Sequence, residues 1–301
     1  MKKVIPIFLI YLSFFVIGCD QEVEEGVMKS DLSKDVEMVT DHGSIVLRLS
    51  DKTPIHRNNF IKLVNQQFYD SIAFHRVIDN FVIQAGNPTT KPSQTYDDNG
   101  DPELDYTIEA EITPSLFHKR GALGAARTGY TSNRSRASSG LQFYIVQRGP
   151  YVDSTLNRSL KRVNTQLAFN KLINSPEISV NIDKYNDLRE RLNEFKEEDK
   201  KAADTVLLNS LKSKIDGYKL DSLAEKEAEQ MKKYKFPEAH REFYKTIGGA
   251  PHLDQNYTIF GEVVHGMSVV DSIAQAKTND SGKPLDDILI ISARMIKRTS
   301  Y

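Results

Sequence analysis

The chain has 301 residues, 39% of them hydrophobic and 27% charged, so it can bury one substantial core and a second element. Its formal net charge is −1, and without an overall basic field nucleic acid is not expected as a partner. The seven histidines show no metal-ligand spacing and no glycine-rich loop could cradle a phosphate, so neither a metal nor another cofactor is expected. A single cysteine excludes a disulfide within one molecule.

Residues 1–18 have the pattern of a signal peptide. Lys2 and Lys3 precede an apolar run, Val4 to Ile17, that is too short to span a bilayer comfortably but suits a signal-peptide core. The run leads into Gly18 and Cys19, as in a bacterial lipobox, where the cysteine is lipidated and becomes the new N-terminus. We therefore predict lipidation at Cys19 and anchoring in the cell envelope, facing the periplasm or the surface. An ordinary signal peptide or an uncleaved anchor with a coincidental cysteine is the alternative.

The next segment, residues 19–35, is polar and acidic without periodicity, which predicts a flexible tether. From Val36, apolar and polar residues alternate on both sides of Asp41 to Gly43, as in a β-hairpin. Thr53 and Pro54 then predict the start of a helix, with the threonine as its cap. The apolar stripe of this helix comprises Phe60, Ile61, Val64 and Phe68.

Short strands separated by turn residues follow the helix. They are expected at residues 72–78, 81–86, 104–111, 121–126 and 142–147. Near the C-terminus we expect a strand over 257–264, a helix over 267–276 and a last strand over 288–296. This spacing favours a barrel or a sandwich over a parallel α/β sheet.

Between these β segments, the apolar spacing becomes helical for about a hundred residues. The stripes are Leu160, Val163 and Leu167; Ile182, Tyr185, Leu188, Leu192 and Phe195; and Leu208, Leu211, Ile215 and Tyr218. We predict a charged α-helical insert over residues 151–246, packed as antiparallel helices or a short coiled coil. Residues 36–150 and 247–301 would then form one discontinuous domain, because neither half could bury its strand edges alone.

Four segments identify a family. FHRVIDNFVIQAGNP, GALGAARTG, SSGLQFYIV and PHLDQNYTIFGEVVHGMSVVD follow one another in the order and chemistry of the cyclophilin motifs, over residues 36–150 and 247–298. The chain thus resembles the cyclophilins, which are β-barrel peptidyl-prolyl cis-trans isomerases. The resemblance implies a mainly β fold, with a closed antiparallel barrel of about eight strands capped by two helices and carrying the α-helical insertion. It also implies rotation of X–Pro bonds, here in exported or envelope proteins.

The resemblance also assigns roles to residues. Arg76 matches the catalytic arginine. The positions matched to substrate binding are His75, Phe81, Val82, Gln84, Ala126, Arg127, Gln142, Tyr144, His252, Leu253 and Tyr257. Many members have Met, Asn, Trp and His at the positions of Val82, Arg127, His252 and Tyr257. Because His252 stands where many members have Trp, tight cyclosporin binding is less expected here, whereas the expectation of catalysis changes little.

These residue types fit the reaction. Rotating an X–Pro bond breaks partial double-bond character at a cost of about 18–20 kcal/mol, and no proton transfer or cofactor is needed. An arginine stays protonated and donates to the nitrogen lone pair that the twisted amide regains. Phe81, Val82, Tyr144 and Leu253 would grip the proline ring, and Gln84 would position Arg76 or the peptide carbonyl. The basic segment 127–136 is expected to be a mobile loop beside the groove.

Two other functions remain open. The barrel could bind proline-containing segments as a chaperone or holdase, with the helical insert as the main client surface and little or no turnover. It could also be a degenerate scaffold, which the presence of Arg76, Phe81 and Gln84 disfavours. For the isomerase and for the holdase, the expected partners are proline-containing polypeptides and, through the lipid, a membrane.

Overall fold

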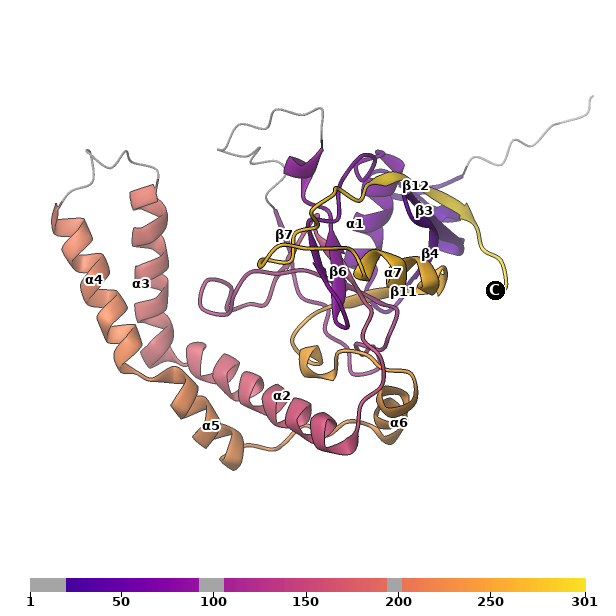
Figure 1. Cartoon of the computed structure of the whole chain (residues 1–301). Helices are drawn as coiled ribbons and strands as arrows, with labels where there is room; N and C mark the ends of the chain where they lie inside the picture. The colour runs from indigo at the N-terminus through magenta and orange to yellow at the C-terminus, as the bar shows by residue number, and fades with distance from the viewer. Residues whose placement is uncertain (1–19, 92–105, 194–201) are drawn as a thin grey trace, which may run out of the picture.

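The computed structural model describes residues 20–91, 106–193 and 202–301. Its main element is a curled eight-stranded antiparallel sheet, beside which the helical insert projects (Figure 1). The strands follow in the order β12 (Ile290–Lys297), β3 (Lys34–Thr40), β4 (Gly43–Leu49), β11 (Ile259–His265), β8 (Ala122–Ala125), β10 (Phe143–Val146), β6 (Val82–Ala85) and β5 (Arg76–Ile78). The expectation of a mainly β, eight-stranded antiparallel fold is confirmed.

The barrel closes only in part. The two outer strands of the sheet, β12 and β5, share no continuous ladder. The residues just before each strand meet instead, through a single bridge between Ala73 and Leu289. Backbone N–H groups of Phe74 and Ile290 donate to Ile288 and Ile72, at 2.9 and 2.8 Å. These contacts join the two edges beside the bridge, and no continuous ladder between β12 and β5 closes the barrel.

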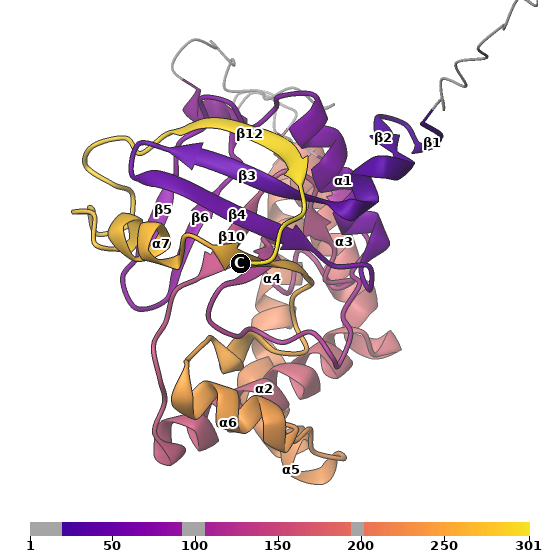
Figure 2. The same cartoon turned by 90° about the vertical axis from the view of Figure 1, so that its right-hand side faces the viewer.

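Helix α1 (Pro54–Asn65) covers one opening of the curled sheet (Figure 2). Its Phe60 meets Phe143 edge to face at 5.5 Å and Phe260 at 5.3 Å, which places an aromatic cluster in the centre of the core. The expected Thr53 side-chain cap is wrong, because that hydroxyl makes no capping hydrogen bond. The carboxylate of Glu111 accepts instead, from the backbone N–H groups of Ile55 and His56. A distant residue thus caps the helix.

Short elements complete this part of the fold. They are α7 (Met267–Ala274), β7 (Thr107–Ile108), β9 (Ser138–Ser139), η2 (Pro88–Thr90) and η5 (Pro251–Leu253). Helix α7 contacts β4, β5 and β6, so it is the second capping helix. The strand expected over 104–111 is reduced to β7, which pairs with β9 outside the main sheet, and residues 104 and 105 are outside the described ranges.

The described part of the expected tether, residues 20–35, is ordered. It forms a small hairpin, β1 (Glu22–Glu24) with β2 (Val27–Met28), and the 3₁₀ helix η1 (Lys29–Ser33), and β3 already begins at Lys34. The reason is Val27, which is fully buried in the barrel core. Asp31 adds an N-terminal anchor, because its carboxylate accepts from the Met28 N–H and from the Asn65 amide on α1. The predicted signal peptide, residues 1–18, and Cys19 lie outside the described residues.

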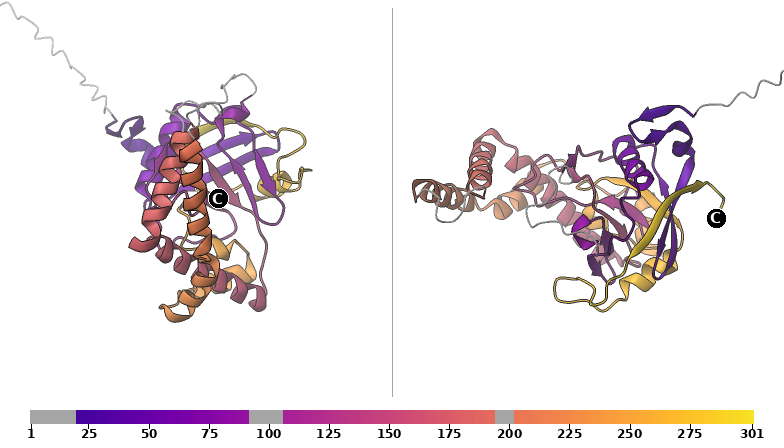
Figure 3. Two further views of the ribbon diagram at one scale, coloured as in Figure 1. Left: turned by 90° about the vertical axis from the view of Figure 1, so that its left-hand side faces the viewer. Right: turned by 90° about the horizontal axis from the view of Figure 1, so that it is seen from above.

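In the region expected to be the insert, the described residues form five helices. They are α2 (Asp153–Ile173), α3 (Pro176–Asn193), α4 (Ala202–Gly217), α5 (Leu220–Gln230) and α6 (Glu238–Thr246). Helix α2 pairs closely with α5 through buried Ala168, Ala224 and Ala228, and α3 pairs with α4 in an arm beside the barrel (Figures 1 and 3). Among the described residues, no helix combines the length and hydrophobicity that crossing a membrane requires.

Candidate active site

Cross-strand register places three of the expected site residues in one row. Arg76 on β5 is paired with Gln84 on β6, Gln84 with Tyr144 on β10, and Tyr144 with Gly124 on β8. Directly paired residues of an antiparallel sheet point to the same face. Alternate positions such as Ile83 and Ile145 belong to the barrel core, so the row lies on the outer face.

Gly124 leaves room for the ring of Tyr144. A Cβ atom at this glycine would overlap the Tyr144 ring, so the absence of a side chain on β8 lets the phenol lie flat across the strand. The Tyr144 side chain is buried, and burial raises the pKa of its hydroxyl well above the ordinary value. The tyrosine is therefore neutral and forms part of the floor of the site.

A cavity of about 440 Å³ opens above this row. Its lining is Arg76, Phe81, Val82, Gln84, Ala126, Arg127, Tyr144, Arg162, His252, Leu253 and Tyr257. Every expected substrate-facing residue is among these except His75 and Gln142. Arg162, on helix α2 of the insert, is the one lining residue that the sequence analysis missed. Within the described residues, no group of three His, Cys, Asp or Glu is placed to hold a metal ion.

The cavity has its own apolar cluster, separate from the barrel core. Val82 and Tyr144 are buried in it, and Phe81, Leu253 and Tyr257 pack against it while remaining partly accessible. Phe81 also stacks on His252, with ring centroids 5.3 Å apart. The cluster can therefore take up a small apolar ring.

Arg76 is the polar group with freedom to act. It is partly exposed, and it makes no hydrogen bond or ion pair with any described side chain. Gln84 does not hold it, because the Gln84 amide donates to Oε1 of Gln142 at 3.1 Å. Burial, and then the neighbouring Arg76 charge, lower the pKa of His75, which favours a neutral imidazole behind the site.

A buried polar chain lies beneath the apolar floor. The Asp254 carboxylate accepts from the backbone N–H and from Nδ1 of His118, both at 2.9 Å, and from the Tyr244 hydroxyl at 2.7 Å. Because Nδ1 must donate to the carboxylate, a neutral His118 leaves Nε2 to accept from the Tyr144 hydroxyl, at 2.8 Å. Tyr244 belongs to α6, so this chain ties the insert to the floor. The sequence carried no spacing signal for it.

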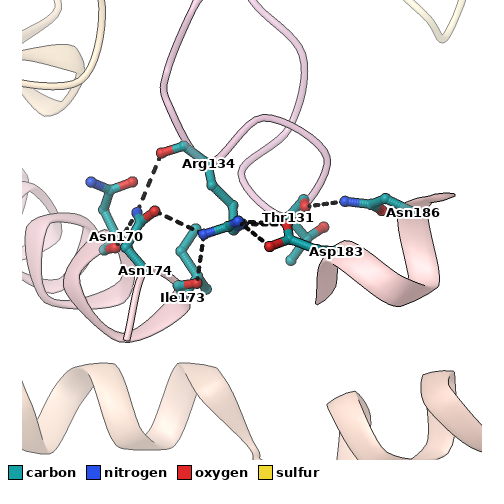
Figure 4. A network of polar contacts seen from close by, with 7 residues as sticks. All are labelled: Thr131, Arg134, Asn170, Ile173, Asn174, Asp183 and Asn186. Carbon is teal, nitrogen blue, oxygen red and sulfur yellow. Dashed lines mark hydrogen bonds and ion pairs between the residues drawn. The ribbon is translucent and has the colours of Figure 1, made fainter. Parts of the chain in front are cut away.

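The segment 127–136, expected to be mobile, is fastened to the insert (Figure 4). Arg134 pairs with both oxygens of Asp183 on α3, at 2.5 and 2.6 Å, and donates to the Asn174 side chain at 3.0 Å. The Asn186 amide donates to the carbonyl of Thr131 at 3.0 Å. The arm therefore braces the loop beside the cavity, through contacts that the sequence analysis did not anticipate.

Comparisons with known proteins show the family of the chain. A family model described as cyclophilin type peptidyl-prolyl cis-trans isomerase/CLD matches residues 35–203 and 228–295. Relatives from Staphylococcus haemolyticus (strain JCSC1435) and Staphylococcus aureus (strain USA300) are 25% and 26% identical over 274 residues. The match covers 91% of this chain and 93% and 94% of the relatives, both named "Putative peptidyl-prolyl cis-trans isomerase".

A crystal structure of a Cryptosporidium parvum cyclophilin type peptidyl-prolyl cis-trans isomerase is also similar, with 17% identity. Its TM-score is 0.47, covering 88% of this chain and 99% of that chain, and this likeness is too distant to carry an argument. The family match needs no such support, because it spans most of the sequence and all four motifs. The chain belongs to the cyclophilin-type peptidyl-prolyl cis-trans isomerase family and is an enzyme of that class.

Proposed function

We propose that this enzyme rotates X–Pro bonds of exported polypeptides, with the Arg76 guanidinium stabilising the twisted amide. The observation that carries the proposal is the position of Arg76, which has no partner among the described side chains. It lies at the wall of a cavity of about 440 Å³ whose apolar side is formed by Phe81, Val82 and Leu253. The proline ring would fill the apolar side, and its nitrogen would face the cation.

The chemistry requires no more than these groups. As the amide twists, its nitrogen regains a lone pair that can accept a hydrogen bond, and an arginine offers several donors with a permanent charge. Since Arg76 has no competing partner among the described side chains, its donors are available to the substrate. The stabilisation is specific to the twisted state, so it raises the rate of rotation in both directions.

Replacement of Arg76 tests the proposal. For Arg76→Ala we expect kcat/KM on an X–Pro peptide to fall about 100- to 1000-fold, the loss typical of removing one preorganised transition-state donor. The charge-preserving Arg76→Lys should recover part of the rate because it keeps a point charge but loses the fork. Exchange NMR of a proline peptide measures the rate, and circular dichroism checks the fold. Wild-type turnover by a folded Arg76→Ala protein would refute the role of this residue.

A second function, holding proline-containing clients on the insert, is favoured by exposed apolar residues on the arm. Val206 and Leu207 on α4 are 69% and 51% exposed, and Val180 on α3 is 49% exposed. Substitution of Val206 and Leu207 by Lys should abolish suppression of client aggregation and leave peptide isomerisation unchanged if the arm binds clients. Suppression that depends on Arg76 instead would assign it to the cavity.

We also propose that the enzyme acts at the cell envelope, anchored through lipid on Cys19. The support is the sequence pattern alone: a short apolar run ending in Gly18 and the single cysteine. More than one acyl chain would make the anchoring stable. Cys19→Ser should release the protein from the membrane fraction and abolish incorporation of labelled fatty acid. Unchanged fractionation and mass would contradict the proposal.

A further inference from the structure

Among the described residues, the cavity is lined by three arginines and by no acidic residue. Arg76 comes from strand β5, Arg127 from the loop after β8, and Arg162 from helix α2 of the insert. An uncompensated positive cavity attracts anionic groups, and its apolar walls strengthen the attraction relative to open solvent.

Arg162 is held at the cavity by the way α2 is seated. Leu156 and Val163 on this helix are fully buried, and α2 packs against η5, which carries His252 and Leu253. One turn beyond Arg162, Oε1 of Gln166 accepts a hydrogen bond from the Asn256 amide at 3.2 Å. These contacts fix the helix beside the cavity wall, so the Arg162 side chain starts from a rigid base.

The guanidinium of Arg162 is free to meet a ligand. Among the described residues it makes no hydrogen bond or ion pair, whereas the neighbouring arginines Arg134 and Arg241 are paired with Asp183 and Asp153. The side chain is exposed at the mouth of the cavity. Its charge acts on the cavity wall, since after burial it is the largest cause of the lowered pKa of His252.

Arg127 adds a second unsatisfied donor. Its Nε donates to the Asn256 carbonyl at 3.0 Å, and its guanidinium lies over the rings of Tyr130 and Tyr257, at 4.3 and 4.6 Å. Its Nη2 is buried, and no acceptor for it is present in the described part of the chain. The described residues therefore leave part of this guanidinium without an acceptor, and its positive charge adds to that of the other two arginines at the cavity.

We propose that the cavity prefers proline segments with an acidic residue close to the X–Pro bond, and that Arg162, from the insert, is the specificity-determining residue. The carboxylate would pair with Arg162 while Arg76 acts on the amide. This inference rests on the proposed isomerase function. It gives the insert a part in substrate choice, because α2 brings to the site a cation that the β segments do not supply.

Two peptide sets that are matched one to one test the preference. In the first set, Glu occupies one of three positions before or after a central Xaa–Pro bond, and in the second set Gln occupies the same position. Exchange NMR gives kcat/KM of the full-length chain for each peptide. The wild type should favour the Glu peptide about two- to fivefold at one or more positions, the range of an exposed ion pair. Because such pairs are screened, 0.5 M salt should remove most of the preference.

The matched variants are Arg162→Ala and Lys161→Ala. Lys161 is the adjacent exposed lysine, and it lines the separate α2–α5 cavity, so its substitution removes the same charge without touching the site. Arg162→Ala should lose the Glu preference, so that kcat/KM becomes equal for the two peptides of a pair, and Lys161→Ala should keep both the preference and the wild-type rates. A wild type without Glu preference, or an Arg162→Ala variant that retains it, would overturn the inference. Inactivity of the wild type on every peptide would instead remove the proposed function.

Discussion

The sheet and the insert hold their side chains at the cavity in different ways. Arg76, Gln84 and Tyr144 are fixed by register with three neighbouring strands, so a slip of one residue would turn the whole row to the other face. Arg162 depends on one helix seated on a small apolar cluster and on local contacts. Substitutions in the sheet should therefore affect the fold and catalysis together. Substitutions in the insert should affect one of the two without the other.

The largest effect is expected where the two regions meet, at Asp254. Asp254→Ala would leave the donors of His118 and Tyr244 buried without an acceptor, which should lower the free energy of unfolding by about 2–4 kcal/mol. Tyr244→Phe removes one donor and keeps the carboxylate, so it should cost about 1 kcal/mol. Since the chain has no tryptophan, urea unfolding followed by circular dichroism is the measurement.

Hydrogen exchange of the Tyr244→Phe protein tests whether the insert and the sheet are coupled. If the buried chain couples the regions, amide protection should fall both in α6 and in β10, where Tyr144 lies. A loss confined to α6 would show that the insert opens independently of the cavity floor.

The next largest effect is expected at Gly124, where the Tyr144 ring leaves no room for a side chain. Gly124→Ala should force the Tyr144 ring out of place, with a loss of about 1–3 kcal/mol in stability, as for overpacked cores, and a fall in kcat/KM. Gly149→Ala is the matched control, because an added Cβ there would meet nothing within 4 Å. In a background that already carries Tyr144→Ala, the stability cost of Gly124→Ala should shrink, because the ring that the new Cβ would overlap is gone. Equal costs of the two glycine substitutions would contradict the crowding argument.

Sequence reasoning predicted the sheet side of the cavity well for a physical reason. Strand alternation and the motif around Arg76 fix which side chains share a face, so one family resemblance places Phe81, Gln84 and Tyr144 together. The helical stripes were readable in part. Ile182 and Leu188 of the second stripe are buried, whereas Leu208, Leu211 and Ile215 of the third are only partly buried, and Phe195 lies outside the described residues.

The sequence could not predict contacts between residues that lie far apart in the chain and belong to no periodic pattern. Glu111 capping α1, and Asp254 joining His118 to Tyr244, each depend on tertiary placement. Arg162 lies beside the apolar stripe of Leu160 and Val163, and a charged residue at such a position is normally expected to face solvent. Only the packing of α2 on η5 shows that this charge faces the cavity.

A smaller effect concerns pH. Burial, with the charges of Arg162, His118 and Arg148 adding to it, lowers the pKa of His252 from 6.5 to about 3. Between pH 6.5 and pH 3, His252 therefore binds a proton in the unfolded chain but not in the folded one. Its contribution to the free energy of unfolding is complete above pH 6.5 and falls as the pH drops towards 3. Between pH 7 and pH 5 the loss from this residue should be on the order of 1–2 kcal/mol.

His252→Phe checks this cause, because a phenyl ring can keep the stack on Phe81 but cannot titrate. Urea midpoints of this variant should decline less between pH 7 and pH 5 than those of the wild type. An identical decline in both proteins would assign the acid sensitivity to other groups.

The smallest expected effect is at the brace between loop and arm. Arg134→Ala removes a two-oxygen pair with Asp183 whose side chains are 22% and 51% exposed, so the cost should be about 0.2–1 kcal/mol. Amide protection should fall in residues 129–136, and Lys184→Ala, next to Asp183 on the exposed side of α3, should leave it unchanged. The rate on a neutral proline peptide should stay near wild type, because Arg76 keeps its strand partners. If Arg134→Ala instead slowed turnover as much as Gly124→Ala does, the arm would be part of the catalytic framework, and the division between a register-fixed sheet and a separable insert would fail.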